Sequence, residues 1–107
     1  MRPLDAQQSA ALSSLLAIGC RSGDTVVGLS SVRRCARLAY VFADSQLAER
    51  TLRELAEWEG RGARVYVLDD FASLTRPFGR SDARVVGVIK GSLADGIAGR
   101  LDLSQRT

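Results

Sequence analysis

The sequence predicts an α/β protein, a three-layer α-β-α sandwich around a four-stranded mixed sheet, formed by a single domain that spans residues 1–107. The length of 107 residues fits one domain of common size. Segments with the apolar spacing of helices alternate with short apolar or β-branched runs that are typical of strands. Such alternation places helices on both faces of a largely parallel or mixed sheet, and no linker or repeat interrupts it.

The first helix is predicted over residues 5–22, where leucines recur at helical spacing among alanines. Asp5 can cap this helix, because its carboxylate can accept hydrogen bonds from the unpaired N–H groups of the first turn. Gly23 and Asp24 form a stop and a turn. The β-branched residues of 25–27 then predict a short strand.

A second helix is predicted from Ser30 and Ser31, whose hydroxyls can cap it, to about Ala36. The apolar run 38–43 predicts a buried strand. Residues 45–59 form the clearest helix, with one apolar and one charged side. The i,i+4 pairs of opposite charge on that side are Glu49–Arg53, Arg50–Glu54 and Arg53–Glu57.

The rest of the chain predicts two more strands and two shorter helices. The strands are expected at residues 64–68 and 85–89, and the helices at residues 70–76 and 92–100. Asp69 or Asp70 can cap the first of these helices. This role explains the acidic pair better than a metal or general-acid site does.

Composition excludes several classes of site. The chain has no histidine, and its two cysteines, Cys20 and Cys35, do not form a Cys-x-x-Cys pair. This pattern excludes zinc fingers, histidine-based triads and most transition-metal sites. We therefore expect no metal, no cofactor and no enzymatic activity. We expect the two thiols to be reduced and partly buried, unless an oxidising compartment and a close approach allow a disulfide.

Hydropathy and charge indicate the partners. No apolar run reaches the ~18–20 residues that span a bilayer, and no secretory signal is apparent, so we expect a cytoplasmic monomer that does not bind membranes. The net charge is +3, and Lys90 is the only lysine among 15 basic residues. Arginine suits bidentate contacts with phosphate, although a GC-rich genome gives the same bias. Segments 1–43 and 71–107 are each basic, whereas 44–70 is acidic, so one face can be basic and another acidic.

The stretch from Leu15 to Asp44 is the most informative part of the sequence. It reads LLAIGCRSGDTVVGLSSVRRCARLAYVFAD and resembles the kink-turn-binding ribosomal protein family of the L-seven-Ae and L-thirty-e type. The positions that match are Leu15, Leu16, Ile18, Arg21, Gly23, Val26, Val27, Gly28, Ser30, Ser31, Arg34, Ala36, Arg37, Leu38 and Asp44. The resemblance extends less specifically over residues 10–98. It implies an L-thirty-e-like fold and a small bacterial homologue that binds structured RNA, such as ribosomal RNA or another kink-turn RNA.

The resemblance also implies RNA contacts from two segments. One is the start of the second helix, where glycine allows close approach, polar residues read bases and arginines bind phosphate. The other is the loop before the last strand, whose arginines can stack on bases. The candidate RNA-binding residues are Gly28, Ser30, Ser31, Arg33, Arg34, Arg37, Arg80 and Arg84.

Two departures from the family leave alternatives open. The family's base-reading pair is often Asn-Glu where this chain has Ser30 and Ser31, and its apolar loop is replaced by residues 80–84, which read Arg-Ser-Asp-Ala-Arg. In the alternative interpretation, Ser30 or Ser31 only caps the helix and the arginines form a solvated face. One functional hypothesis is therefore recognition of kink-turn RNA, in the ribosome or elsewhere. The other is a protein–protein adaptor that keeps the fold without specific RNA recognition.

Overall fold

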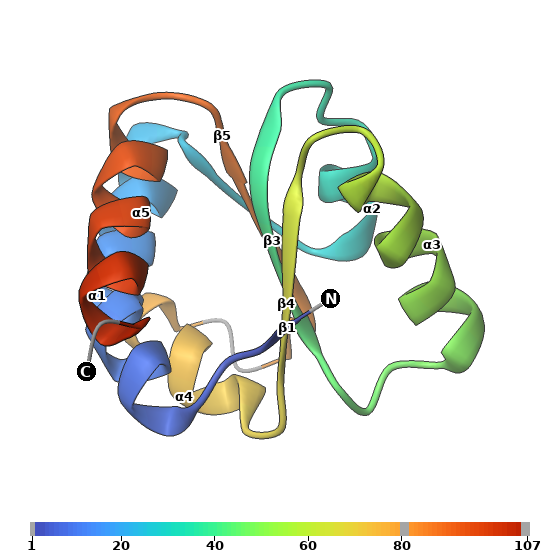
Figure 1. The fold of residues 1–107 in the computed structure, drawn as a ribbon, viewed down its shortest axis with the longest axis horizontal. Coiled ribbons are helices and arrows are strands. Elements are labelled where there is room, and N and C mark those ends of the chain that lie inside the picture. The colour runs from blue at the N-terminus through green and yellow to red at the C-terminus, as the bar shows by residue number, and fades with distance from the viewer. Residues whose placement is uncertain (1, 80–81, 106–107) are drawn as a thin grey trace.

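The computed structural model describes residues 2–79 and 82–105, and this part of the chain forms an α/β fold (Figure 1). The strands are β1 (Arg2–Pro3), β2 (Thr25–Val27), β3 (Leu38–Asp44), β4 (Arg64–Leu68) and β5 (Val85–Ile89). The helices are α1 (Ala6–Ser22), α2 (Leu29–Arg33), α3 (Glu49–Glu59), α4 (Phe71–Thr75) and α5 (Ser92–Gln105), and the 3-10 turn η1 (Arg76–Phe78) follows α4.

The sheet is mixed, as predicted, but it has five strands where the sequence predicted four. Its order is β1-β4-β3-β5-β2. Strand β4 is parallel to β1 and β3, whereas β5 is antiparallel to β3 and β2. The prediction missed β1 because it is only two residues long and includes Pro3. Proline is tolerated there because β1 lies at the edge of the sheet.

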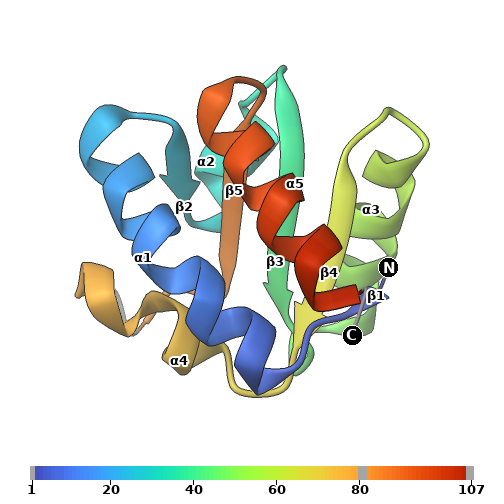
Figure 2. The same ribbon diagram turned by 60° about the vertical axis from the view of Figure 1, so that its left-hand side comes forward.

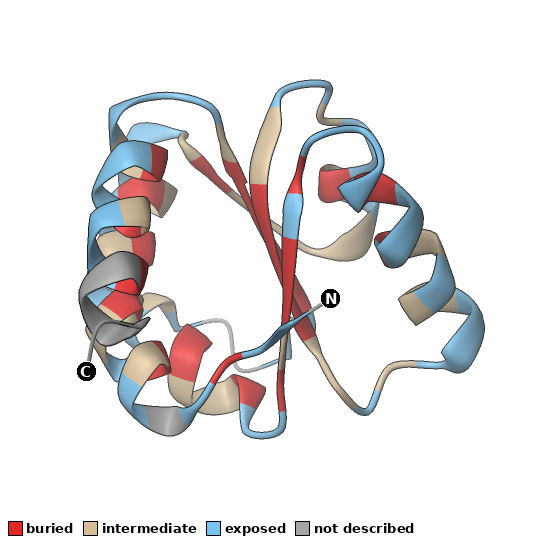
Figure 3. Ribbon diagram, viewed as in Figure 1, coloured by how far each residue is buried: buried red, intermediate tan, exposed pale blue. Residues whose placement is uncertain are grey.

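Helices cover both faces of the sheet. Helices α2 and α3 lie on one face, and α1, α4 and α5 lie on the other (Figures 1 and 2). The two helical layers enclose two separate clusters of buried side chains (Figure 3). Alternation along β3 divides its residues between them: Tyr40 and Phe42 join the α1/α5 cluster, and Val41 and Ala43 join the α2/α3 cluster. Trp58, whose exposed fraction is 9%, belongs to the α2/α3 cluster.

The helices differ in whether a side chain caps their first turn. Asp5 caps α1 as predicted: its carboxylate accepts a 2.7 Å hydrogen bond from the Gln8 N–H, and the Gln8 side chain accepts one from the Asp5 N–H. The predicted serine cap of α2 is wrong, because α2 begins at Leu29 with Gly28 at the cap position and no side-chain cap. Asp70 precedes α4 without capping it.

Helices α3 and α5 differ most in length from their predictions. Helix α3 begins at Glu49, because residues 45–48 form a turn in which the Asp44 carboxylate accepts a 2.9 Å hydrogen bond from the Gln46 N–H. Helix α5 continues to Gln105, beyond the expected end. The packing of buried side chains such as Ile97 stabilises the helix by more than its glycines destabilise it.

Cys20 and Cys35 are half-buried and do not form a disulfide. Within residues 2–79 and 82–105, no helix has both the length and the apolar character that a membrane crossing requires.

Candidate nucleic-acid interface

The start of α2 presents backbone donors. Gly28 has a φ of 96°, a conformation that favours glycine, and its N–H donates a 2.8 Å hydrogen bond to the Val85 carbonyl. The first N–H groups of a helix have no acceptor within the helix. Since no described side chain caps α2, the N–H groups of Leu29, Ser30 and Ser31 are potential donors to a ligand.

The bond between Gly28 and Val85 also joins the two segments that the resemblance implied. Arg84 directly precedes Val85 and is exposed. Ser30 is exposed and Ser31 is half-buried. The structure therefore places Gly28, Ser30, Ser31 and Arg84 at one end of the sheet, which we name the donor end. Arg80, the other candidate of this loop, lies outside the described residues.

Carboxylates share the donor end. The Asp44 N–H donates a 2.9 Å hydrogen bond to the Arg84 carbonyl, and Asp82 precedes Arg84 by two residues. Asp69 follows β4 and accepts a 2.8 Å hydrogen bond from the Ser45 hydroxyl. These charges repel phosphate, so an RNA contact here depends on backbone donors, hydroxyls and Arg84. No group of three His, Cys, Asp or Glu residues among those described is placed to hold a metal ion.

Arg33 is engaged by a carboxylate. Its guanidinium donates two 2.8 Å hydrogen bonds to the Glu54 carboxylate and so joins α2 to α3. The hydrogen bonds from Arg33 lower the pKa of Glu54 below its usual value, against a smaller opposing effect of burial. The predicted pair of Glu54 with Arg50 is wrong, because Glu54 pairs with Arg33 instead. The predicted pair of Glu49 with Arg53 is confirmed, with a distance of 2.8 Å between their charged groups. The Glu54 carboxylate offsets the charge of Arg33 and so weakens its attraction for phosphate.

The substitution Glu54→Gln is expected to lower stability slightly at neutral pH, because it removes the charge that Arg33 holds. The lowered pKa of Glu54 means that its contribution is present above the ordinary value of 4.5 and is lost as pH falls through the folded-state pKa. Thermal unfolding of both proteins from neutral to acidic pH measures this: the difference between them should vanish at low pH. A difference that grows as pH falls would contradict the pairing.

Arg34 and Arg37 are exposed and follow α2. The Lys90 N–H donates a 2.8 Å hydrogen bond to the Arg37 carbonyl, so Arg37 lies beyond the opposite end of β5 from Arg84. Five residues of strand span about 13 Å between their first and last Cα atoms. The structure therefore separates Arg37 from the donor end, although the sequence grouped them.

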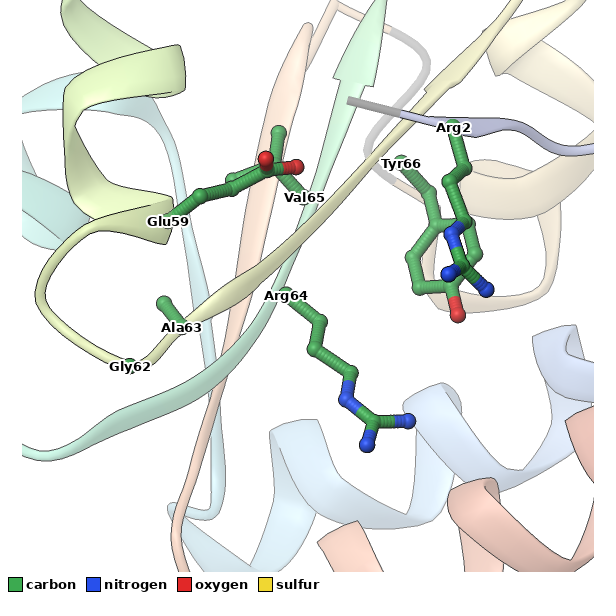
Figure 4. Close-up of a pocket in the computed structure, with 7 residues that line it drawn as sticks. All are labelled: Arg2, Glu59, Gly62, Ala63, Arg64, Val65 and Tyr66. Atoms are coloured by element: carbon green, nitrogen blue, oxygen red, sulfur yellow. The ribbon is translucent and has the colours of Figure 1, made fainter.

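Arg37 lies near cations that were not among the candidate RNA-binding residues. Arg64 begins β4 and lines a cavity of about 250 Å³ together with Lys90 and Gly62. Arg64 also lines an adjoining cavity of about 440 Å³, and its side chain points to the side of β4 that is covered by α1 and α5 (Figure 4). We name Arg37, Arg61, Arg64 and Lys90 the basic end. Each of these residues lies near one end of a strand. The sequence shows this, but only the directions of the strands show that these ends lie together.

Comparisons with known proteins support the fold. No protein-family model and no curated protein sequence matches the chain. A solved structure of a protein with unknown function from Bacillus halodurans is similar, with a TM-score of 0.67 and 19% identity over 92% of this chain and 99% of that one. The Giardia lamblia 15.5kD RNA binding protein is also similar, with a TM-score of 0.68 and 17% identity over 94% of this chain and 92% of that one. The chain therefore shares its mixed α/β fold with an RNA-binding protein.

Proposed function

We propose that this chain is a non-catalytic RNA-binding protein whose donor end docks on a kink turn or a similarly bent, structured RNA. The observation that carries the proposal is the hydrogen bond between Gly28 and Val85, which sets the backbone donors of α2 beside Arg84. The fold shared with the Giardia RNA binding protein, together with the family resemblance of residues 15–44, supports RNA as the class of ligand.

The chemistry of the donor end suits a bent RNA. Backbone N–H groups and serine hydroxyls can hydrogen-bond to base edges and to sugar–phosphate oxygens. The absence of a side chain at Gly28 leaves this surface open, since a Cβ atom there would have no neighbour within 4 Å. The Arg84 guanidinium can stack on an unstacked base or bind a phosphate.

The carboxylates of Asp44 and Asp82 affect which kind of RNA the donor end can bind. They weaken attraction to a uniform row of phosphates, so affinity has to come from directed hydrogen bonds. An RNA that presents splayed bases satisfies those donors, and a regular duplex does not. We therefore expect discrimination by RNA shape.

The test is a fluorescence anisotropy titration of a kink-turn RNA and of the same RNA without its sheared G·A pairs. The protein is expected to prefer the intact kink turn. The variants S30A/S31A and Arg84→Ala are each expected to reduce that preference by about 10-fold, because a directed contact to a base contributes about 1–3 kcal/mol of discrimination.

The matched control is S13A/S14A, which removes two hydroxyls from α1, away from the donor end. It should leave the preference unchanged. Equal affinity of the unmodified protein for the two RNAs would refute kink-turn recognition, and equal effects of the control and S30A/S31A would refute the assignment to the donor end.

A second candidate function is a protein–protein adaptor. The carboxylates of Asp44, Asp69 and Asp82 at the donor end favour it, because an acidic surface suits a basic protein better than a polyanion. Affinity purification with and without RNase distinguishes the two functions. A partner protein that is retained after RNase treatment, with no RNA in the untreated sample, would favour the adaptor.

A further inference from the structure

The topology gathers four cations at the end of the sheet opposite the donor end. Arg37 precedes β3, Arg61 and Arg64 flank the start of β4, and Lys90 follows β5. The hydrogen bond from the Lys90 N–H to the Arg37 carbonyl joins two of these segments. The cavity shared by Arg64, Lys90 and Gly62 joins the third. These cations are therefore neighbours in space although they span more than half of the chain.

The four side chains of the basic end are exposed. Within residues 2–79 and 82–105 none of them forms an ion pair, whereas Arg33 and Arg53 do. Their positive charge is thus not neutralised by a direct contact.

Three carboxylates, those of Asp24, Glu59 and Asp95, lie at this end with the four cations, so they reduce its positive charge without reversing it. Asp95 lines the same cavity as Arg64 and Lys90, and Asp24 accepts a 2.7 Å hydrogen bond from the Ser22 hydroxyl. Glu59 lines the cavity of about 440 Å³ together with Arg64, with its side chain on the other side of β4 (Figure 4).

The two ends of the sheet therefore differ in charge. Asp44, Asp69 and Asp82 lie at the donor end with its single described arginine, Arg84, whereas four cations and three carboxylates lie at the basic end. A polyanion is drawn to the region of positive potential, and each phosphate that a cation neutralises releases a counterion. The basic end is thus the more favourable place for a sugar–phosphate backbone.

We propose that the basic end is a second RNA contact surface, which binds backbone phosphates while the donor end recognises the bend. The inference rests on the proposed function for the identity of the polyanion. The seven residues of β3 place the two ends about 20 Å apart, so different segments of one RNA occupy them. The cations come from separate segments and are spread over the surface, an arrangement that suits successive phosphates better than one small anion.

The test compares two triple variants of the full chain, each of which lowers the net charge by the same amount. The variant R37A/R64A/K90A removes cations of the basic end. The matched control, R50A/R76A/R100A, removes exposed arginines from α3, η1 and α5. Kink-turn affinity is measured between about 50 and 200 mM salt, the range over which phosphate contacts change affinity strongly.

The basic-end variant is expected to bind about 10-fold more weakly at about 100 mM salt. The slope of log affinity against log salt should fall by about 2, since each phosphate contact contributes about 0.7–0.9. R37K/R64K should keep the slope, because it keeps the charges. Circular dichroism and thermal unfolding verify that the variants fold alike.

Each outcome separates this inference from the proposed function. If the two triple variants lose affinity and slope equally, the effect is one of net charge and the inference is overturned, whereas kink-turn preference can still hold. If the basic-end variant alone loses slope but the unmodified protein ignores the G·A pairs, the inference stands and kink-turn recognition fails. Absence of RNA binding at the lowest salt overturns both.

Discussion

Replacement of Phe42 by alanine is expected to lower the free energy of unfolding by about 3–5 kcal/mol, the largest effect that we predict for a single residue. Phe42 is fully buried on β3, in the middle of the sheet. Its ring stacks on those of Tyr40 and Tyr66, with centroid distances of 6.2 and 5.8 Å. The substitution removes both ring contacts and leaves a cavity between the sheet and the α1/α5 layer.

The measurement is equilibrium unfolding in urea, with Ile18→Ala as the control. Ile18 is 51% exposed, so its truncation should change stability by no more than about 0.5 kcal/mol. Domains of this kind have a total stability of about 5–15 kcal/mol, so Phe42→Ala can unfold a substantial fraction of the protein. A loss below about 1 kcal/mol would show that the stacked rings do not support the core.

The second large effect is expected at Gly19 of α1. A Cβ atom at this position would collide with the Thr25 hydroxyl and the Leu93 side chain and would lie 3.0 Å from the Thr25 Cβ atom. Alanine has the higher helix propensity by about 1 kcal/mol, but overpacking of a filled site costs about 1–3 kcal/mol. The rigid, buried Thr25 cannot move aside easily, so Gly19→Ala is expected to destabilise the protein.

Gly96 of α5 provides the matched control. A Cβ atom at Gly96 would have no neighbour within 4 Å, so Gly96→Ala should raise stability by about 0.4–1 kcal/mol. The same substitution in two helices of one protein is thus expected to have opposite signs, which urea unfolding of both variants measures. A stabilising effect at both positions would mean that α1 does not pack against β2 and α5 as described.

The candidate site was predictable in part, and Gly28 and Arg33 show the limit. A glycine before a short helix is visible in the sequence, and together with the family resemblance it located the donor end. The engagement of Arg33 was not visible, because Glu54 is 21 residues away and belongs to another helix. Local i,i+4 spacing suggested Arg50 as the partner of Glu54, and tertiary packing brought Arg33 closer instead.

The missing strand has a similar cause. Two residues, one of them Pro3, carry no periodic signal, and β1 forms only because β4 offers an unpaired edge. The serines at the start of α2 show the opposite case, a feature that was predicted and does not form. Ser30 and Ser31 have the composition of a cap, but Gly28 takes the cap position because its backbone is held by Val85 across the sheet.

By itself, the sequence determined the order and kind of the longer elements, because helix propensity, capping by Asp5 and apolar alternation act over a few residues. It also determined that nearly all of the basic residues are arginines. Only the tertiary structure decided which charges meet. Strand direction and pairing set Arg84 among carboxylates at one end of the sheet and Arg37, Arg64 and Lys90 at the other. These groupings depend on contacts between residues that are far apart in the chain, so no local pattern encodes them.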